Sequence, residues 1–380
     1  MPVRPVQFGE HQGPLDMNPI HLIAGARPNF MKIAPIVRAL RGRGVPYRIV
    51  HTGQHYDRDM NEVFFEELGI PQPDVFMGAG GGSHAEQTAR IMVAYEKYVA
   101  EHVPSLTLVV GDVNSTLACA IVAKKACIPV AHVEAGLRSG DMAMPEEINR
   151  LVTDSISDVY FATEPSGVHH LLREGKDKSA VHNVGHVMVD NLLYQVAQLD
   201  NADKGRLEGA DLKAKLGRYG AVTMHRPSNV DDAEVFRGIA GALKEISRDL
   251  PLVFPVHPRT RGNLEKFGID LGPNVHLTKP LSYMAFLNVW RDAVLVMTDS
   301  GGLQEETTAL GVPCITMREN TERPVTCDEG TNVLAGTDPV AILREARNVL
   351  STGGRKGRVP DLWDGRAAER IVDVLVKMVG

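Results

Sequence analysis

The chain has 380 residues, of which 43% are hydrophobic and 23% charged, and its formal net charge is −6. This composition is typical of a globular protein, and the length exceeds what one hydrophobic core usually serves, so we expect two domains. The acidic balance without a long basic run disfavours nucleic acid as a partner. The absence of an apolar run of about 18 residues disfavours a membrane span.

The cysteines and the first residues indicate the compartment. Four cysteines without a C-x-x-C spacing favour a reducing compartment, the cytoplasm. Residues 1–18 are rich in proline and polar groups and lack the apolar segment of a secretory signal. We interpret them as a flexible N-terminal extension.

Short β-branched runs alternate with helical patterns from Ile20 onward, which predicts βα units and a mainly parallel sheet. In the helix after the first strand, Phe30, Ile33 and Val37 recur at spacings of three and four. A second helix is predicted over 84–102. The strands of this first series are expected near residues 20–24, 47–51, 106–110, 128–133, 158–162 and 181–184.

The alternation restarts after the polar stretch 200–219, which we read as a helix and loop of the second domain or as a linker. A last helical pattern covers 367–378. Two doubly wound domains would each direct the carboxyl ends of their strands into a shared crevice, where ligands bind in open α/β sheets. The second series predicts strands near 220–224, 252–256, 274–277, 294–298 and 312–316, and helices near 232–247, 282–291 and 302–310.

The segment TDSGGLQEE places a glycine turn between a buried strand and a helix. Gly301 and Gly302 permit a tight turn, and the unpaired N–H groups of the following helix would form an anion site. The alternative is an ordinary βα turn with Ser300 as the N-cap. The segment therefore predicts either a phosphate cradle or a simple connection.

Two cations lie around the start of the first helix. A positive charge at that end opposes the helix dipole unless an anion lies between, so Arg27 and Lys32 indicate a bound phosphate. Solvated surface charge is the alternative.

Carboxylates follow two predicted strands and open a helix. Asp112 and Glu134 come at the carboxyl ends of strands, and Glu146 lies in a first helical turn. The alternatives are an N-cap for Asp112 and a dipole interaction or an Arg150 pair for Glu146. Glu134 lies in an apolar run, where an acid is costly unless it is paired, with Arg138 as the nearest cation. Three acids in one crevice would suit acid/base chemistry.

Two histidines, His225 and His257, follow predicted strands of the second series. Each could bind phosphate or hydrogen-bond a loop, and the spacing leaves both open. No Walker A sequence, H-E-x-x-H or cysteine-rich metal pattern is present, and GAGGGSH lacks the full dinucleotide fingerprint. We therefore predict no metal site and no dinucleotide cofactor.

The chain contains, in this order, the motifs GARPNFMKIAP, HTGQHYD, GDVNSTLA, HVEAGLRSGD, PEEINR, HRPSN, PVHPRT, TDSGGLQEE and RENTERP. Taken together, these ordered motifs resemble those of non-hydrolysing UDP-N-acetylglucosamine 2-epimerases. The resemblance spans Ile20 to about Gly336. It implies an α/β fold of two Rossmann-like doubly wound domains facing a central cleft (GT-B-like), a homodimer and no cofactor. The domains would be 19–185, joined by a C-terminal helix 366–380, and 186–365.

The resemblance also implies a role for each matching residue. The acid/base carboxylates would be Asp112, Glu134 and Glu146. Diphosphate contacts that stabilise the leaving group would come from Arg27, Lys32, His225 and the turn Ser300, Gly301, Gly302. The nucleoside would be bound by Phe286 at the uracil, Glu306 at the ribose and Arg323. Some bacterial members bind a second substrate molecule as an activator, and the matching positions are Gln54, His55 and His257.

The implied reaction is reversible C2 epimerisation of UDP-N-acetylglucosamine, in which UDP leaves to give a 2-acetamidoglucal and then adds again. Asn29 and Ser228 stand where the family usually has glutamate. A related branch acts on UDP-2,3-diacetamido-glucuronate, although the TERP motif favours the N-acetylglucosamine branch. Competing functions are those of a glycosyltransferase on the same fold, a hydrolysing epimerase and a UDP-sugar sensor.

Overall fold

The computed structural model describes residues 17–54 and 62–379. The chain divides into two compact units. Unit 1 comprises the residues up to Val184 together with those from Ala368 onward, and unit 2 comprises Gly185–Ala367. Most of the predicted N-terminal extension, up to residue 16, and the predicted effector residue His55 lie outside the described residues.

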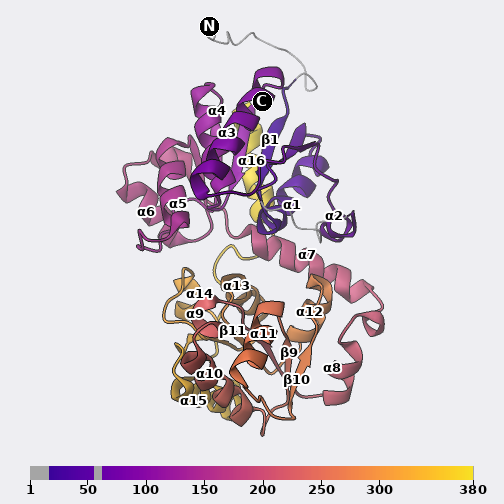
Figure 1. Ribbon diagram of the computed structural model, residues 1–380. Coiled ribbons are helices and arrows are strands. Elements are labelled where there is room, and N and C mark those ends of the chain that lie inside the picture. Colours follow the sequence, from indigo (N-terminus) through magenta and orange to yellow (C-terminus); the bar gives the residue numbers. More distant parts are fainter. Residues whose placement is uncertain (1–16, 55–61, 380) are drawn as a thin grey trace. The chain divides into compact units, whose positions relative to one another are not determined.

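Unit 1 contains a seven-stranded parallel sheet in the order β3-β2-β1-β4-β5-β6-β7 (Figure 1). The chain winds outward in one direction from β1 and then in the other from β4, so the strand order reverses between these two strands. In doubly wound sheets this switch point is where ligands bind, at the carboxyl ends of the strands. The strands are β1 Ile20–Ala24, β2 Tyr47–His51, β3 Val75–Phe76, β4 Leu106–Val110, β5 Val130–Val133, β6 Val159–Ala162 and β7 Val181–Asn183.

Unit 2 repeats this winding in a six-stranded parallel sheet, ordered β10-β9-β8-β11-β12-β13. The switch point lies between β8 and β11. The strands are β8 Gly220–Thr223, β9 Leu252–Pro255, β10 Val275–Thr278, β11 Leu295–Thr298, β12 Cys314–Thr316 and β13 Asn332–Leu334.

Helices connect the strands, as the crossovers of parallel sheets require. Those of unit 1 are α1 Arg27–Gly42, α2 Glu62–Leu68, α3 His84–Glu101, α4 Asn114–Lys125, α5 Pro145–Ile156, α6 Pro165–Arg173 and the last helix, α16 Ala367–Val379. Those of unit 2 are α7 Val187–Asn201, α8 Ala210–Leu216, α9 Pro227–Val230, α10 Ala233–Ile246, α11 Pro258–Phe267, α12 Tyr283–Trp290, α13 Gly301–Leu310, α14 Pro324–Asp328 and α15 Pro339–Thr352.

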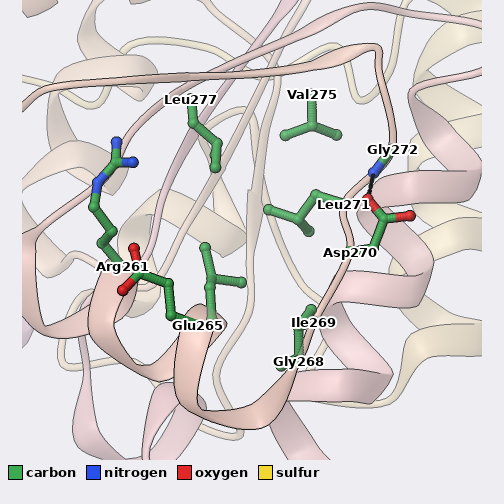
Figure 2. Close-up of a pocket in the computed structure, with 10 residues that line it drawn as sticks. Arg261, Glu265, Gly268, Ile269, Asp270, Leu271, Gly272, Val275 and Leu277 are labelled. Carbon is green, nitrogen blue, oxygen red and sulfur yellow. Dashed lines mark hydrogen bonds between the residues drawn. The ribbon is translucent and has the colours of Figure 1, made fainter.

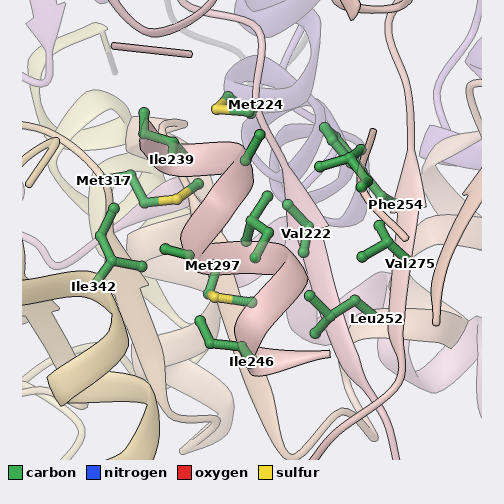
Figure 3. Packing of buried hydrophobic residues seen from close by; sticks show 14 of the residues in the cluster. Val222, Met224, Ile239, Ile246, Leu252, Phe254, Val275, Met297, Met317 and Ile342 are labelled. Carbon is green, nitrogen blue, oxygen red and sulfur yellow. The ribbon is translucent and has the colours of Figure 1, made fainter. Parts of the chain in front are cut away.

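Each sheet is covered by its own hydrophobic core. In unit 2 a cluster from β8, β9 and β11, which includes Val222, Phe254 and Met297, packs against α10 and α15 (Figure 3). In unit 1 the strands β1 and β4 are buried along their whole length. Strands buried on both faces explain why the sequence shows continuous apolar runs rather than alternation.

Helix α16 completes unit 1. Ile371 and Leu375 are fully buried, Arg43 Nη2 lies 2.5 Å from Asp373 Oδ1, and Arg370 Nη1 donates to the Val184 carbonyl at 3.1 Å. Within the described ranges, no helix combines the length and apolarity needed to cross a lipid bilayer.

Candidate active site

The site residues predicted for unit 1 lie at the carboxyl ends of its strands. Arg27 opens α1 three residues after β1, Asp112 follows β4, and Glu134 directly follows β5. Because β1, β4 and β5 are neighbours in the sheet, their carboxyl ends bring these residues to one edge, next to the switch point.

Glu134 is the most constrained of the three carboxylates. Its side chain is only 3% exposed and forms an ion pair with Lys32 of α1. A side chain at Gly111 would lie 2.8 Å from Lys32 Nζ and 3.3 Å from Glu134 Oε2, so glycine is required there to leave room for the pair. The backbone φ of Glu134 is +69°, in the left-handed region. The cation that contacts Glu134 is thus Lys32, which corrects the partner expected from the sequence; Arg138 contacts Asp154 and Glu174.

Asp112 is held by α5. It forms an ion pair with Arg150, and Asn149 Nδ2 donates to its carbonyl at 2.8 Å. Val113 is the N-cap residue of α4, so the N-cap alternative for Asp112 is wrong. Arg150 also lies 2.7 Å from Glu147 Oε2. Helix α5 therefore ties its own first turn to the end of β4.

Glu146 lies in that first turn of α5 and is partly exposed. Within the described parts of the chain no ion pair joins it to Arg150, contrary to the i,i+4 alternative, since Arg150 pairs with Asp112 and Glu147. Glu147, in contrast, is buried and accepts hydrogen bonds from the amides of Ser139 and Gly140 at 3.0 Å each. Of the two adjacent acids, Glu146 is the one left accessible for chemistry.

Asn29, which departs from the family pattern, has a clear structural role. Its Oδ1 accepts from the amides of Gly25 and Ala26 at 3.1 and 3.0 Å, and its Nδ2 donates to the Val110 carbonyl at 3.3 Å. The amide side chain joins the β1–α1 turn to the end of β4. The Arg27 guanidinium lies 5.1 Å from the centre of the Phe64 ring, a cation–π contact.

The predicted effector residue Gln54 is buried. Its Oε1 accepts from the amide and the hydroxyl of Ser115, at 2.9 and 2.7 Å. These bonds tie the end of β2 to the first turn of α4. Ser228, the second departure, is exposed, and its hydroxyl donates to Asn229 Oδ1 at 3.0 Å.

In unit 2, His225 and Ser300 follow β8 and β11, the two strands at the switch point. Asp299 is fully buried between them, and its Oδ2 accepts from the amides of His225 and Arg226 at 2.9 and 2.8 Å. The His225 ring Nδ1 lies 3.1 Å from Asp299 Oδ1, and the side chain remains 48% exposed. The His225 ring thus lies beside Asp299 and remains partly open to a ligand.

The glycine turn forms the start of α13. Among the described residues, the Ser300 hydroxyl makes no capping hydrogen bond to this helix, and the first turn of α13 contains no acidic residue. A Cβ added at Gly302 would meet nothing within 4 Å, and one at Gly301 would meet only Glu322 Oε2, at 3.9 Å. A helix start with uncapped N–H groups and little side-chain cover is suited to an anion.

Glu306 lies one turn further along α13. It is buried, and the Tyr283 hydroxyl donates to its Oε1 at 2.9 Å. Burial raises the pKa of Glu306 to about 7, and the charge of neighbouring Glu305 acts in the same direction, against the Tyr283 hydrogen bond. Phe286, on α12 with Tyr283, is partly buried against the core of unit 2.

Arg323 opens α14 and is held from α13. Its Nε lies 2.6 Å from Glu305 Oε1, which is also 2.6 Å from Nε2 of the buried His186. Thr321 accepts from the Arg323 amide at 3.0 Å and donates to Gln304 at 2.6 Å. Two neighbouring residues of α13 thus fix the loop that carries Arg323.

His257 is exposed, and its Nδ1 accepts from the Arg259 amide at 3.3 Å, so it caps α11. Of the two roles left open by the sequence, the structure shows the local hydrogen bond.

A cavity of about 430 Å³ lies between α11 and the edge strand β10 (Figure 2). Arg261 and Glu265 come from the helix and Leu277 from the strand. The predicted site residues do not line it, and it is away from the switch point of the sheet. We therefore place the candidate site at the strand ends rather than in this cavity.

Sequence reasoning did not select Asp299 or Glu305 as site residues, and it gave Arg150 a different partner. All three have buried charged side chains that hold a predicted ligand-binding or catalytic residue. Asp299 could have been selected from the sequence, because a carboxylate directly after an apolar strand must find buried hydrogen-bond donors.

Comparison with known proteins identifies a family for these residues. The family described as UDP-N-acetylglucosamine 2-epimerase matches residues 38–376. The UDP-N-acetylglucosamine 2-epimerase of Methanococcus maripaludis is 39% identical, covering 94% of this chain and 98% of the relative. The UDP-2,3-diacetamido-2,3-dideoxy-D-glucuronate 2-epimerase of Pseudomonas aeruginosa is 40% identical, covering 94% and 99%.

One solved structure is similar to this protein in both fold and sequence. The crystal structure of Methanocaldococcus jannaschii UDP-GlcNAc 2-epimerase in complex with UDP-GlcNAc and UDP matches with a TM-score of 0.83. The identity is 38%, and the match covers 94% of this chain and 99% of that chain. The predicted α/β class with two doubly wound domains is confirmed.

Proposed function

Because the chain belongs to the UDP-N-acetylglucosamine 2-epimerase family, we propose that it reversibly converts UDP-N-acetylglucosamine to UDP-N-acetylmannosamine without hydrolysis. It is an epimerase of nucleotide sugars. The observation that carries the proposal is the cluster at the ends of β4 and β5, where Asp112 and Glu134 are each paired with a cation, Arg150 and Lys32.

The chemistry requires a leaving group. The C2 hydrogen of the sugar is not next to a carbonyl, so its removal by a carboxylate gives no stabilised carbanion. If the C1–O bond to UDP breaks as the C2 proton leaves, the electron pair forms the C1–C2 double bond of a 2-acetamidoglucal. Return of a proton to the other face of C2 and addition of UDP at C1 then complete the inversion.

Three carboxylates would move the protons. Glu134 and Asp112 each contact a cation, Lys32 and Arg150 respectively. Glu146 is accessible at the start of the neighbouring helix α5. General acid/base catalysis of this kind typically contributes about 10²–10⁴-fold in rate for each group.

The departing diphosphate would be stabilised electrostatically. Unit 2 offers the open start of α13 at Ser300, the partly exposed imidazole of His225 and the guanidinium of Arg323. Unit 1 offers Arg27 and the two remaining ammonium hydrogens of Lys32. Such stabilisation is commonly the largest single contribution to catalysis. Glu306 would bind the ribose and Phe286 the uracil.

Proton exchange tests the proposal directly. In D₂O, both UDP-sugars recovered from the reaction should carry deuterium at C2, as read by proton NMR. Retention of the original hydrogen would exclude deprotonation at this carbon.

Variants then test the assignment of the base. Glu134→Gln should lower turnover by at least about 10²-fold while still binding UDP. Asp158→Asn is the matched control, because Asp158 also pairs with a lysine of unit 1, Lys124 at 2.6 Å, but lies at the surface. Unchanged turnover in Glu134→Gln would remove this residue from the acid/base set.

A second substrate is favoured by one observation: the Pseudomonas aeruginosa relative, named for UDP-2,3-diacetamido-2,3-dideoxy-D-glucuronate, is as similar to this chain as the Methanococcus maripaludis enzyme. Incubation in D₂O with each UDP-sugar separately decides between them. We expect exchange at C2 with UDP-N-acetylglucosamine. Exchange confined to the diacetamido sugar would reassign the substrate.

We also propose a homodimer with an effector site at Gln54, His55 and His257, on the basis of the family resemblance. Light scattering at several concentrations tests the dimer. A reaction started from UDP-N-acetylmannosamine alone should show a lag that added UDP-N-acetylglucosamine removes. An immediate linear rate would argue against activation.

A further inference from the structure

A buried histidine stands behind the two carboxylates of unit 1. His132 lies on β5 and is fully buried. Its Nε2 lies 2.8 Å from the Gly111 carbonyl oxygen, and its Nδ1 lies 2.7 Å from Asp154 Oδ1 on α5. Both ring nitrogens are therefore within hydrogen-bond distance of oxygen atoms.

These partners determine the protons on the ring. A carbonyl oxygen only accepts, so Nε2 carries a hydrogen. Asp154 is ionised: burial raises its pKa, but His132 and Arg138 outweigh burial, and the net pKa is lowered. Its Oδ2 also accepts from the Gly136 amide at 3.0 Å and lies 2.8 Å from Arg138 Nη1. An ionised carboxylate accepts as well, so each ring nitrogen of His132 faces a hydrogen-bond acceptor.

The network holds both catalytic turns. The Gly111 carbonyl lies directly before Asp112, and the Gly136 amide lies two residues after Glu134. Glu134, at a φ of +69°, is a non-glycine residue in the left-handed region and needs support from its surroundings. Gly111 and Gly136, at +66° and +81°, shape the two turns without such strain. Neither His132 nor Asp154 is among the groups to which the proposed reaction assigns a proton transfer.

We propose that His132 and Asp154 are positioning residues: a doubly protonated imidazole holds the turn bearing Asp112, and Asp154 holds the turn bearing Glu134. The inference about rate rests on the proposed epimerase function, whereas the inference about the protons on the ring does not. Misplacement of catalytic groups by about 1 Å can cost about 10²-fold in rate.

The inference also predicts a pH dependence. The charged and titratable groups around the imidazolium are Asp154, Arg138 in the loop between β5 and α5, and Glu174 at the end of α6. Glu174 Oε2 lies 2.6 Å from Arg138. His170 of α6 contacts the Gly136 carbonyl at 2.8 Å, and burial with nearby Asp154 raises the pKa of Tyr160 to about 12. Loss of either ring proton at high pH would break one of the two hydrogen bonds, so turnover should fall.

Two variants separate positioning from stability. His132→Gln cannot make both hydrogen bonds, so kcat should fall about 10²-fold while UDP affinity stays within about twofold. In Asp154→Asn the amide can donate to Nδ1, so a neutral ring with one hydrogen on Nε2 still holds Gly111, and the alkaline fall in kcat should disappear. His182→Gln, a change of a half-buried histidine on β7, is the control and should leave the kcat profile unchanged.

The ring itself can be observed independently of activity. In protein labelled with ¹⁵N-histidine, both nitrogens of His132, assigned by their loss in His132→Gln, should show the shifts of an imidazolium near neutral pH. Shifts of a neutral ring would overturn the proposal even if the enzyme is active. A kcat of His132→Gln within about threefold of the wild type would also overturn it. If His132→Gln does not fold, Asp154→Asn provides the test. The imidazolium signals of His132 should be absent from the NMR spectrum of that variant, and its kcat should show no alkaline fall. Absence of C2 exchange in the wild type would refute the proposed function and leave the NMR result to stand.

Discussion

Glu134 carries two costs that an ordinary surface acid avoids. Its left-handed backbone costs roughly 1–2 kcal/mol for a residue with a Cβ, and its side chain is withdrawn from solvent, with Lys32 as its ion partner. A buried ion pair contributes little net stability because both groups lose hydration. A carboxylate retained at a position with both of these costs is consistent with selection for chemistry rather than for stability.

Glu306 gives a prediction about stability and pH. Its pKa is raised from 4.5 to about 7 in the folded protein. The folded state therefore binds more protons than the unfolded state between these values, and wild-type stability falls as the pH rises through this window. Glu306→Gln removes this loss, so the variant should gain about 2–3 kcal/mol relative to wild type at pH 8 but not at pH 4.

Urea unfolding of both proteins at the two pH values measures this difference. Glu245→Gln, which alters a partly exposed carboxylate of α10 in the same unit, is the control and should show little change. An equal difference between wild type and Glu306→Gln at both pH values would contradict the assignment of the raised pKa.

At the scale of the element, Asn29 joins α1 to β4. Asn29→Asp keeps the two acceptor bonds to the amides of Gly25 and Ala26 but replaces the donor to the Val110 carbonyl with an oxygen. The folded state should lose about 1–3 kcal/mol, because a buried acceptor loses its partner.

Chemical denaturation measures this loss. Asn201→Asp is the matched control: Asn201 Nδ2 also donates to a backbone carbonyl, that of Ala197 at 2.9 Å, but at the surface of α7. Its effect should stay within about 0.5 kcal/mol. If the two substitutions cost the same, Asn29 does not hold the turn as described.

Strands β1 and β4 could be predicted from the sequence because each is an apolar run buried along its whole length. The predictions 20–24, 47–51 and 106–110 coincide with β1, β2 and β4. The short strands β3 and β13 were not predicted. Two or three residues carry no periodicity, and β3 is defined by its pairing with β2 rather than by its own side chains.

The candidate site was likewise predicted only in part. Ordered motifs selected Asp112 and Glu134, because acids after apolar strands are conspicuous. Their partners could not be derived, since Lys32 is 102 positions from Glu134 and Arg150 is 38 positions from Asp112. Contacts over such separations depend on the strand order, which local patterns do not encode.

At the scale of the whole molecule, the proposed nucleotide contacts predict which segments UDP protects from hydrogen exchange. If unit 2 binds most of the nucleotide, saturating UDP should slow hydrogen exchange there, in 225–230, 298–306 and 321–323. At 100 times its dissociation constant, a ligand stabilises the folded state by about 2.7 kcal/mol. Strands β6 and β7 of unit 1 should change little. Protection confined to unit 1 would refute the proposed nucleotide contacts.

Unit 2 is one uninterrupted stretch of sequence, whereas unit 1 lacks α16 until the final residues are added. Without α16, unit 1 therefore leaves the apolar surface that Ile371 and Leu375 cover exposed, whereas the sequence of unit 2 is complete. A chain truncated before Ala367 should bind chaperones through unit 1, and a chain that retains α16 should not.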